Sequence, residues 1–222
     1  MRILWILAAW TGYFMLHSAL ASRRAKTAFA RRFPPLAPAY RLLFNAVALL
    51  SAALPLGLAW AARGPVVWAW PGMGAPIARA LAAAAAAGFL WTLRTYDLQE
   101  FLGLRQWKTG DASPDDRQRL RISPLHRFVR HPWYFLGLVL LWTQPMDAAR
   151  LASAVAITVY LVAGSRLEEK KLLQTHGEPY AAYRQAVPGL VPLPWRWLTR
   201  AQADALTGGA QTQARELPPR SP

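Results

Sequence analysis

Long apolar segments separated by charged loops constrain this chain more than any other feature of its sequence. Five such segments stand out, at residues 3–21, about 42–62, about 75–96, roughly 132–146 and about 149–165. At about 1.5 Å per residue, the first three are long enough to cross a hydrocarbon core of about 30 Å. The pattern predicts an all-α integral membrane protein with about five transmembrane helices.

The fourth apolar segment is short for a membrane span and is followed almost directly by the fifth. Only a Gln-Pro-Met-Asp stretch at residues 144–147 separates them. Two apolar segments joined by so short a connection are expected to run antiparallel and to pack against each other. We therefore predict that the last two helices form a tight hairpin.

The charges between the apolar segments predict the orientation of the chain in the membrane. The formal net charge is +15, and the first loop, residues 22–41, carries six basic and no acidic residues. Positively charged loops stay in the cytoplasm, which places the N-terminus outside and the part of the chain from Leu167 inside. Ala19-Leu20-Ala21 also resembles a signal-peptidase site, but the basic block that follows favours an uncleaved span.

Composition argues against several classes of function. The arginines flank apolar segments and form no motif with interleaved aromatic residues, so we expect no nucleic-acid partner. The chain has no cysteine, which excludes disulfides and a protein thiol nucleophile. His126 and His131 lack the helical spacing of metal ligands, and we predict no metal site. Residues 1–198 are interpreted as one membrane domain, and the polar residues 199–222 as a disordered tail.

Polar residues gather at the predicted cytoplasmic ends of the apolar segments: His17, Asn45, Asp97, Glu100, His131, Glu168 and Glu169. Pro132 removes a backbone donor at the mouth of the fourth segment, which leaves carbonyl groups available there. The convergence predicts a functional site at one membrane face. Each residue also has a structural interpretation: the glutamates as a solvated helix end, His17 as a packed histidine bonded to a carbonyl, and Asn45 as a link between helices.

These residues belong to motifs that resemble a known family. Arg130-His131-Pro132-Trp133-Tyr134, then Glu168-Glu169, then the stretch from His176 to Pro188 resemble the C-terminal motifs of membrane methyltransferases that use S-adenosylmethionine. This superfamily includes isoprenylcysteine carboxyl methyltransferases and phospholipid methyltransferases. The order R-H-P-x-Y, helical hairpin, E-E and F-G-x-x-Y-x-x-Y followed by V-P is similar over about residues 123–194, the expected cofactor-binding part.

The N-terminal half is similar to one branch of that superfamily. Three stretches, residues 17–22, 40–45 and 100–106, resemble the NnrU branch, which includes bacterial methanethiol S-methyltransferases. Two positions depart from the family pattern. Residues 123–129 replace a Gly-hydrophobic-Tyr-Arg stretch, and His176 stands where an aromatic residue usually precedes the glycine.

The resemblance implies roles for individual residues. It implies that the following bind S-adenosylmethionine: Arg130, His131, Pro132, Tyr134, Glu168, Glu169, Tyr180, Tyr183 and Arg184. It also makes Glu168 and Arg166 the candidate catalytic residues. Arginine charge suits the cofactor carboxylate, carboxylates suit its amine and ribose hydroxyls, and a dry pocket favours charge neutralisation during methyl transfer.

The sequence therefore predicts an integral membrane methyltransferase of the bacterial inner membrane, with its active site facing the cytoplasm. The expected acceptor is a small or apolar molecule, in particular a thiol, with membrane lipids as the surrounding partners. Two alternatives stay open. One is a non-catalytic membrane accessory protein of the NnrU type linked to denitrification, which the two departures would suit. The other is a methyltransferase for a prenylcysteine carboxylate or a lipid amine.

Overall fold

The computed structural model describes residues 1–94, 97–110 and 120–216, with side chains described as far as residue 208. The chain divides into two compact units. Unit 1 contains residues 1–114 and 138–160, and unit 2 contains residues 115–137 and 161–222. The described elements are almost entirely helical, as predicted.

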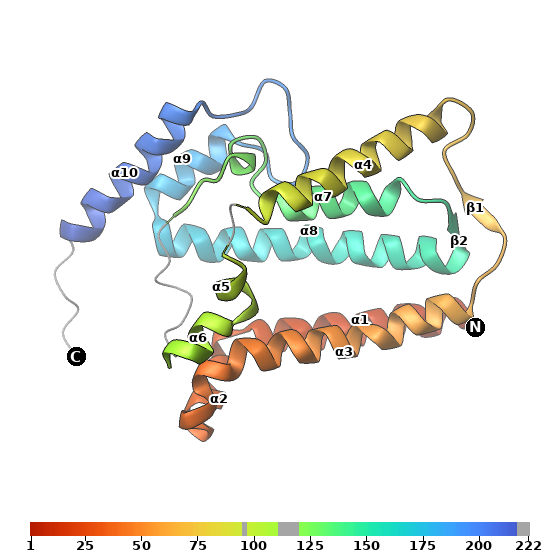
Figure 1. Ribbon diagram of the computed structural model, residues 1–222, viewed down its shortest axis with the longest axis horizontal. Coiled ribbons are helices and arrows are strands. Elements are labelled where there is room, and N and C mark those ends of the chain that lie inside the picture. Colours follow the sequence, from red (N-terminus) through yellow and green to blue (C-terminus); the bar gives the residue numbers. More distant parts are fainter. Residues whose placement is uncertain (95–96, 111–119, 217–222) are drawn as a thin grey trace. The chain divides into compact units, whose positions relative to one another are not determined.

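Unit 1 is built on two antiparallel helices, α1 (Arg2–Ala21) and α3 (Tyr40–Ala61), which lie side by side in Figure 1. The short helices α2 (Arg23–Arg32) and η1 (Pro34–Ala39) connect them. Ile6 and Trp10 of α1 are buried in one cluster with Ala59 of α3 and Ala149 of α8 (Ala148–His176). The uncleaved interpretation of residues 3–21 stays a prediction.

Four described helical stretches are long and apolar enough to cross a membrane: Arg2–Ala21, Pro34–Ala61, Gly74–Thr92 and Ala148–His176. The third of these is helix α4. Tyr96, the predicted end of the third apolar segment, lies outside the described residues. The outer faces of these helices carry exposed leucines such as Leu49 and Leu50, as expected for surfaces that contact lipid. Helix α7 (Pro132–Trp142) has 11 residues, about 16 Å, which is half the thickness of the core. The fifth span thus stays a prediction.

Helices α7 and α8 form the predicted hairpin. Near the turn, within unit 1, the indole Nε1 of Trp142 donates to Thr158 Oγ1 at 3.0 Å. At the other end, within unit 2, His131 contacts Glu169. The beginning of α7 thus meets the later part of α8, and its end meets the earlier part, which confirms the antiparallel pairing.

A short strand pair joins the hairpin turn to the loop before α4. Strand β1 (Val66–Trp68) pairs antiparallel with β2 (Met146–Asp147). The indole Nε1 of Trp70 donates to the carbonyl of Trp142 at 2.9 Å, and the Trp68 ring packs edge-on against the Trp142 ring. The loop before α4 and the hairpin turn therefore meet at one end of unit 1.

The polar residues of unit 1 mostly organise the turns at the opposite end. Asp97 caps α5 (Leu98–Leu102), since its Oδ1 accepts from the backbone N–H of Glu100 at 3.0 Å. Arg105 of α6 (Leu104–Thr109) forms an ion pair with Asp97. The side-chain amide of Asn45 donates to the carbonyl of Leu102 at 3.1 Å, so Asn45 links α3 to α5. Asn45 therefore acts as the link between helices that was its structural interpretation.

Unit 2 has its own core around helix α9 (Glu178–Ala186). Tyr180, Tyr183 and Val187 are buried there with Leu198 and Ala203. Ala203 belongs to α10 (Arg200–Glu216), which lies where a disordered tail is predicted from Thr199 onward. Ala203 and Leu206, three residues apart on one helix face, pack against the α9 core. Residues 217–222 lie outside the described residues.

Gly103, between α5 and α6, gives a test of this packing. Its φ is +89°, and an added Cβ would lie 2.8 Å from Arg41 Cβ and 2.9 Å from the backbone nitrogen of Leu42. We expect Gly103→Ala to lower the free energy of unfolding by about 2 kcal/mol or more, from backbone strain and overlap together. Thermal unfolding in detergent measures the change. Gly12→Ala is the control, because its Cβ would meet nothing within 4 Å. An equal, small effect of both variants would contradict the expectation.

Candidate functional site

The mouth of α7 is held by the segment that follows α9. The backbone N–H of Arg130 donates to the carbonyl of Pro188 at 2.8 Å, and that of His131 donates to the carbonyl of Gly189 at 3.1 Å. Pro132, which is buried, is the first residue of α7, a position where its missing N–H costs no helical hydrogen bond. The predicted R-H-P and V-P motifs are thus brought together by backbone pairing.

Arg130 and Glu169 form a nearly buried ion pair at the centre of this arrangement. Arg130 Nη2 lies 2.7 Å and Nε 2.9 Å from Glu169 Oε1, with side chains only 11% and 13% exposed. The remaining Arg130 nitrogen, Nη1, donates to the carbonyl of Arg184 at 2.8 Å and to that of Val187. The Arg130 guanidinium is therefore occupied by groups of the chain itself, in the manner of a structural arginine.

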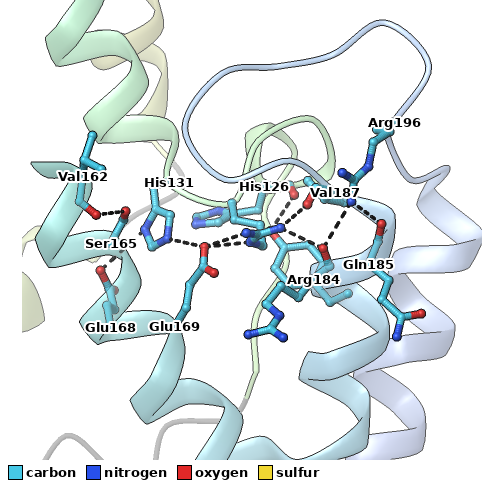
Figure 2. Close-up of polar contacts among 12 residues, drawn as sticks. His126, His131, Val162, Ser165, Glu168, Glu169, Arg184, Gln185, Val187 and Arg196 are labelled. Atoms are coloured by element: carbon cyan, nitrogen blue, oxygen red, sulfur yellow. Dashed lines mark hydrogen bonds and ion pairs between the residues drawn. The ribbon is translucent and has the colours of Figure 1, made fainter.

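His131 lies between the two neighbouring glutamates, as Figure 2 shows. Its Nε2 is 3.1 Å from Glu169 Oε1, and its Nδ1 is 3.5 Å from Glu168 Oε2. The ring stacks on that of Tyr134, with centroids 5.3 Å apart. The Tyr134 hydroxyl in turn donates to Glu168 at 3.4 Å. These contacts unite four of the predicted cofactor-binding residues in one cluster.

The two glutamates have different environments although they are adjacent in sequence. Glu169 is enclosed by Arg130 and His131, whereas the Glu168 side chain is 50% exposed. Glu168 therefore keeps acceptor capacity toward a molecule outside the cluster. The interpretation of this pair as a merely solvated helix end does not fit Glu169.

Tyr180 and Tyr183, two of the predicted cofactor-binding residues, lie in the α9 core with their rings edge to face. The Tyr183 hydroxyl donates to the carbonyl of His126 at 2.7 Å. The Tyr180 hydroxyl is buried and has no hydrogen-bond partner among the described residues. Burial, followed by the negative charge of Glu169, raises the pKa of Tyr180, so this hydroxyl keeps its proton. A buried donor without a partner is rare and marks a place for a ligand or water.

The first departure from the family pattern forms a compact turn. His126 lies in the short helix η3 (Leu125–Arg127), and its Nδ1 is 2.7 Å from Ser123 Oγ. Burial, with a smaller contribution from His131, lowers the pKa of His126 to about 4. His126 therefore stays neutral near pH 7. The second departure, His176, ends α8 just before Gly177, whose φ of +56° turns the chain into α9.

Arg166 and Arg184 are the two predicted site arginines that the cluster does not enclose. Both side chains are exposed, and neither takes part in an ion pair among residues 120–208 of the described chain. Arg166 stands two positions before Glu168 on α8, and residues so spaced leave a helix on different sides. The catalytic roles of Arg166 and Glu168 stay predictions.

Gly189 is a residue of the site that the sequence alone did not reveal. A Cβ at this position would lie 3.3 Å from Arg130 Nη2 and 3.6 Å from Glu169 Oε1. A glycine here lets the backbone approach the ion pair closely. The Val-Pro motif directly before it was the available signal, since it marks an extended segment whose carbonyl groups can accept hydrogen bonds.

A second polar cluster lies within unit 1. His17 Nδ1 is 2.8 Å from the Tyr160 hydroxyl, which is also 3.1 Å from Ser18 Oγ. The ring of Phe14 stacks on that of Tyr160 at 4.1 Å. His17 thus bonds a side chain of α8 rather than a backbone carbonyl. The convergence of this cluster with His131 and Glu168 at one membrane face stays a prediction. Among the described residues, no group of three or more His, Asp or Glu has the arrangement of a metal site.

Comparison with known proteins gives several relatives of one kind. The methanethiol S-methyltransferase of Crocosphaera subtropica is 29% identical over 191 residues, which cover 82% of this chain and 71% of the relative. That of Pseudomonas sp. strain GM41(2012) is 39% identical over 100 residues, 42% of this chain and 36% of the relative. That of Mycobacterium tuberculosis is 34% identical over 99 residues, 44% and 41% of the two chains.

The chain thus spans less than half the length of the latter two relatives. No protein-family model matches the chain, and no solved structure matches it. The relatives confirm the resemblance to membrane methyltransferases that the motifs indicated, and they are consistent with its methanethiol S-methyltransferase branch.

The enclosed ion pair predicts opposite behaviour for the two glutamates. In Glu169→Gln the nearly buried Arg130 loses its counter-charge, and we expect the free energy of unfolding to fall by about 3 kcal/mol. Glu168→Gln is the matched control, and it should cost about 1 kcal/mol or less because Glu168 is half exposed. Thermal unfolding of the two variants in detergent measures the difference. If both melted together with the wild type, Glu169 would not be holding the site.

His126 predicts a pH dependence of stability. Its pKa is about 4 in the folded chain, below the usual value of about 6.5, so the unfolded chain takes up the proton first as the pH falls. The contribution of neutral, buried His126 to the free energy of unfolding is fully present above about pH 6.5 and is lost as the pH falls from there to about 4. We expect the melting temperature to fall through this window, and to fall less in His126→Gln. Parallel curves for both proteins would contradict this assignment.

Proposed function

We propose that this protein is an integral membrane methyltransferase that moves a methyl group from S-adenosylmethionine to a small or apolar thiol. The observation that supports this most is the cluster of Arg130, His131, Glu168 and Glu169 at the mouth of α7. It unites the motifs shared with membrane methyltransferases, in a chain similar to several methanethiol S-methyltransferases. The proposed location is the bacterial inner membrane, with the site facing the cytoplasm.

The residues of unit 2 suit S-adenosylmethionine. The molecule carries a sulfonium, an ammonium and ribose hydroxyls, which favour carboxylate partners, and Glu168 keeps one exposed carboxylate. The Tyr180 hydroxyl is a buried donor in need of an acceptor. We propose that Glu168, His131, Tyr134 and Tyr180 hold the cofactor, and that Arg166 or Arg184 takes its carboxylate. Arg130 and Glu169 position His131.

When bound, S-adenosylmethionine supplies a methyl group on a positively charged sulfur, open to in-line attack. The contribution of the chain is to orient the two reactants and to exclude water. Free thiols have a pKa of about 8.5, and nearby positive charge favours the reactive thiolate. Glu169 neutralises Arg130, so the positive charge that favours the thiolate would come from Arg166 and Arg184. No protein base is required, because the thiol proton passes to water.

The alternative functions receive less support. A non-catalytic accessory protein of the NnrU type would not need an exposed carboxylate beside an enclosed one. An amine acceptor is protonated near pH 7, and the positive charges of Arg166 and Arg184 would repel it. The named relatives act on a thiol, not on a prenylcysteine carboxylate or a lipid amine.

Cofactor binding is the first test. We expect the purified chain in detergent to bind S-adenosylmethionine or its demethylated product in a calorimetric titration. His131→Ala and Glu168→Ala should each weaken binding tenfold to more than a hundredfold, because each removes a charged hydrogen-bonding partner worth about 1.5–3 kcal/mol. Asp204→Asn, at an exposed position of α10, is the control and should bind as the wild type does. Unchanged affinity in both site variants would place the pocket elsewhere.

The acceptor is the second test. Purified protein is incubated with labelled S-adenosylmethionine and a panel of methanethiol, longer alkyl thiols, prenylcysteine and phosphatidylethanolamine. We expect label in the thiols, because thiolates form readily beside Arg166 and Arg184. Label in the lipid amine or the prenylcysteine carboxylate, with none in any thiol, would refute the thiol assignment. Cofactor binding without transfer to any acceptor would favour the accessory protein.

A further inference from the structure

Helix α2 follows α1 after a single residue and leaves in a new direction. Ser22 has an extended backbone, with φ of −70° and ψ of 148°, which ends α1 at Ala21. Its Oγ accepts from the backbone N–H of Ala25 at 3.2 Å and so caps the new helix. Because α1 is a candidate membrane span, α2 begins where that span ends.

Two aromatic contacts fix α2 beside the ends of two spans. The Tyr40 hydroxyl at the start of α3 donates to the carbonyl of Leu20 at the end of α1, at 2.6 Å. The Phe29 ring of α2 packs against the Tyr40 ring at 5.1 Å and against the Phe33 ring at 5.3 Å. The inner side of α2 is thereby held beside the end of α1 and the start of α3.

The outer side of α2 is strongly basic. Five of its ten residues are Lys or Arg and none is acidic. Arg24 and Arg31, seven positions apart, lie on one face two turns apart, and both are exposed. Neither has an acidic partner among the described residues. These guanidinium groups are therefore available to water or to an anionic partner outside the chain.

Exposed apolar side chains accompany these charges. Phe33 and Leu36, just after α2, are 44% and 45% exposed. The Arg32 guanidinium lies over the Phe33 ring at 5.1 Å. Aromatic and leucine side chains beside a row of arginines are typical of segments that lie in the headgroup region of a bilayer. A nucleic-acid surface would have no use for apolar groups presented beside two membrane spans.

We propose that α2 and η1 form a binding surface for anionic phospholipids. Arg24 and Arg31 contact the headgroup phosphates, while Phe33 and Leu36 enter the boundary with the acyl chains. A basic residue near an anionic membrane surface contributes about 1 kcal/mol, which is about a fivefold preference for an anionic over a zwitterionic lipid. This inference does not rest on the proposed methyltransferase function.

The test is native mass spectrometry of the full-length chain in detergent, titrated with phosphatidylglycerol or phosphatidylcholine of the same acyl chains. The wild type should retain phosphatidylglycerol preferentially. In Arg24→Gln/Arg31→Gln this preference should fall roughly twenty-five-fold, with an unchanged melting temperature because neither side chain has an acidic partner among the described residues. In Phe33→Ala/Leu36→Ala the retention of both lipids should fall.

The control is Arg79→Gln/Arg200→Gln, which removes the same charge from exposed positions of α4 and α10. Its lipid preference should match that of the wild type. An equal loss in both double variants would mean that net charge, and not this surface, selects the lipid, and would overturn the proposal. So would displacement of phosphatidylglycerol by millimolar glycerol phosphate, or by a short RNA that bound through Arg24 and Arg31.

Discussion

A buried cation needs a buried anion, and Arg130 and Glu169 meet this requirement where α7 begins. The pair draws in the later part of α8, the carbonyl group of Arg184 in the last turn of α9, that of Val187 just after α9, and the glycine at position 189. Once the pair is formed, His131 has one fixed orientation, because its Nε2 shares the same carboxylate oxygen. Glu168 precedes Glu169 on the same helix, so its side chain points in another direction and stays half exposed. The candidate site is thus organised by an ion pair whose hydrogen-bonding groups are satisfied within the chain.

Unit 1 treats polarity differently. His17, Ser18 and Tyr160 share neutral hydrogen bonds within apolar helices, and Asn45 bonds backbone carbonyls. Such bonds are worth little individually, about 0.6 kcal/mol on average in membrane proteins. They suit the pairing of helices that have no hydrophobic driving force between them in lipid. The charged residues of unit 1 lie in the loops, in the short helices such as α2, and near the ends of the long helices, where headgroups and water can solvate them.

Hydrophobic pattern, charge bias and motif order were sufficient to predict the helical membrane fold, the hairpin and the residues around His131. Local pattern identifies such features because each depends on neighbours in sequence. The hydrogen-bond acceptors of Arg130 could not be predicted in this way. They are backbone carbonyls 54 and 57 positions away, and every residue type has such a carbonyl. Helix α10 was missed for a similar reason. Its polar composition hides the two apolar positions, Ala203 and Leu206, that pack on the distant α9 core.

The length of α8 has a consequence for the chemistry of the two glutamates. Its 29 residues span about 43 Å, whereas about 20 residues fill a hydrocarbon core. Counted from Ala148, Glu168 is the first residue beyond that length. One unbroken helix therefore carries both carboxylates to the boundary between a low and a high dielectric constant. There Arg130 neutralises the charge of Glu169, whereas Glu168 is exposed and keeps its net negative charge. The two adjacent carboxylates therefore differ in the electrostatic potential that they produce at a distance.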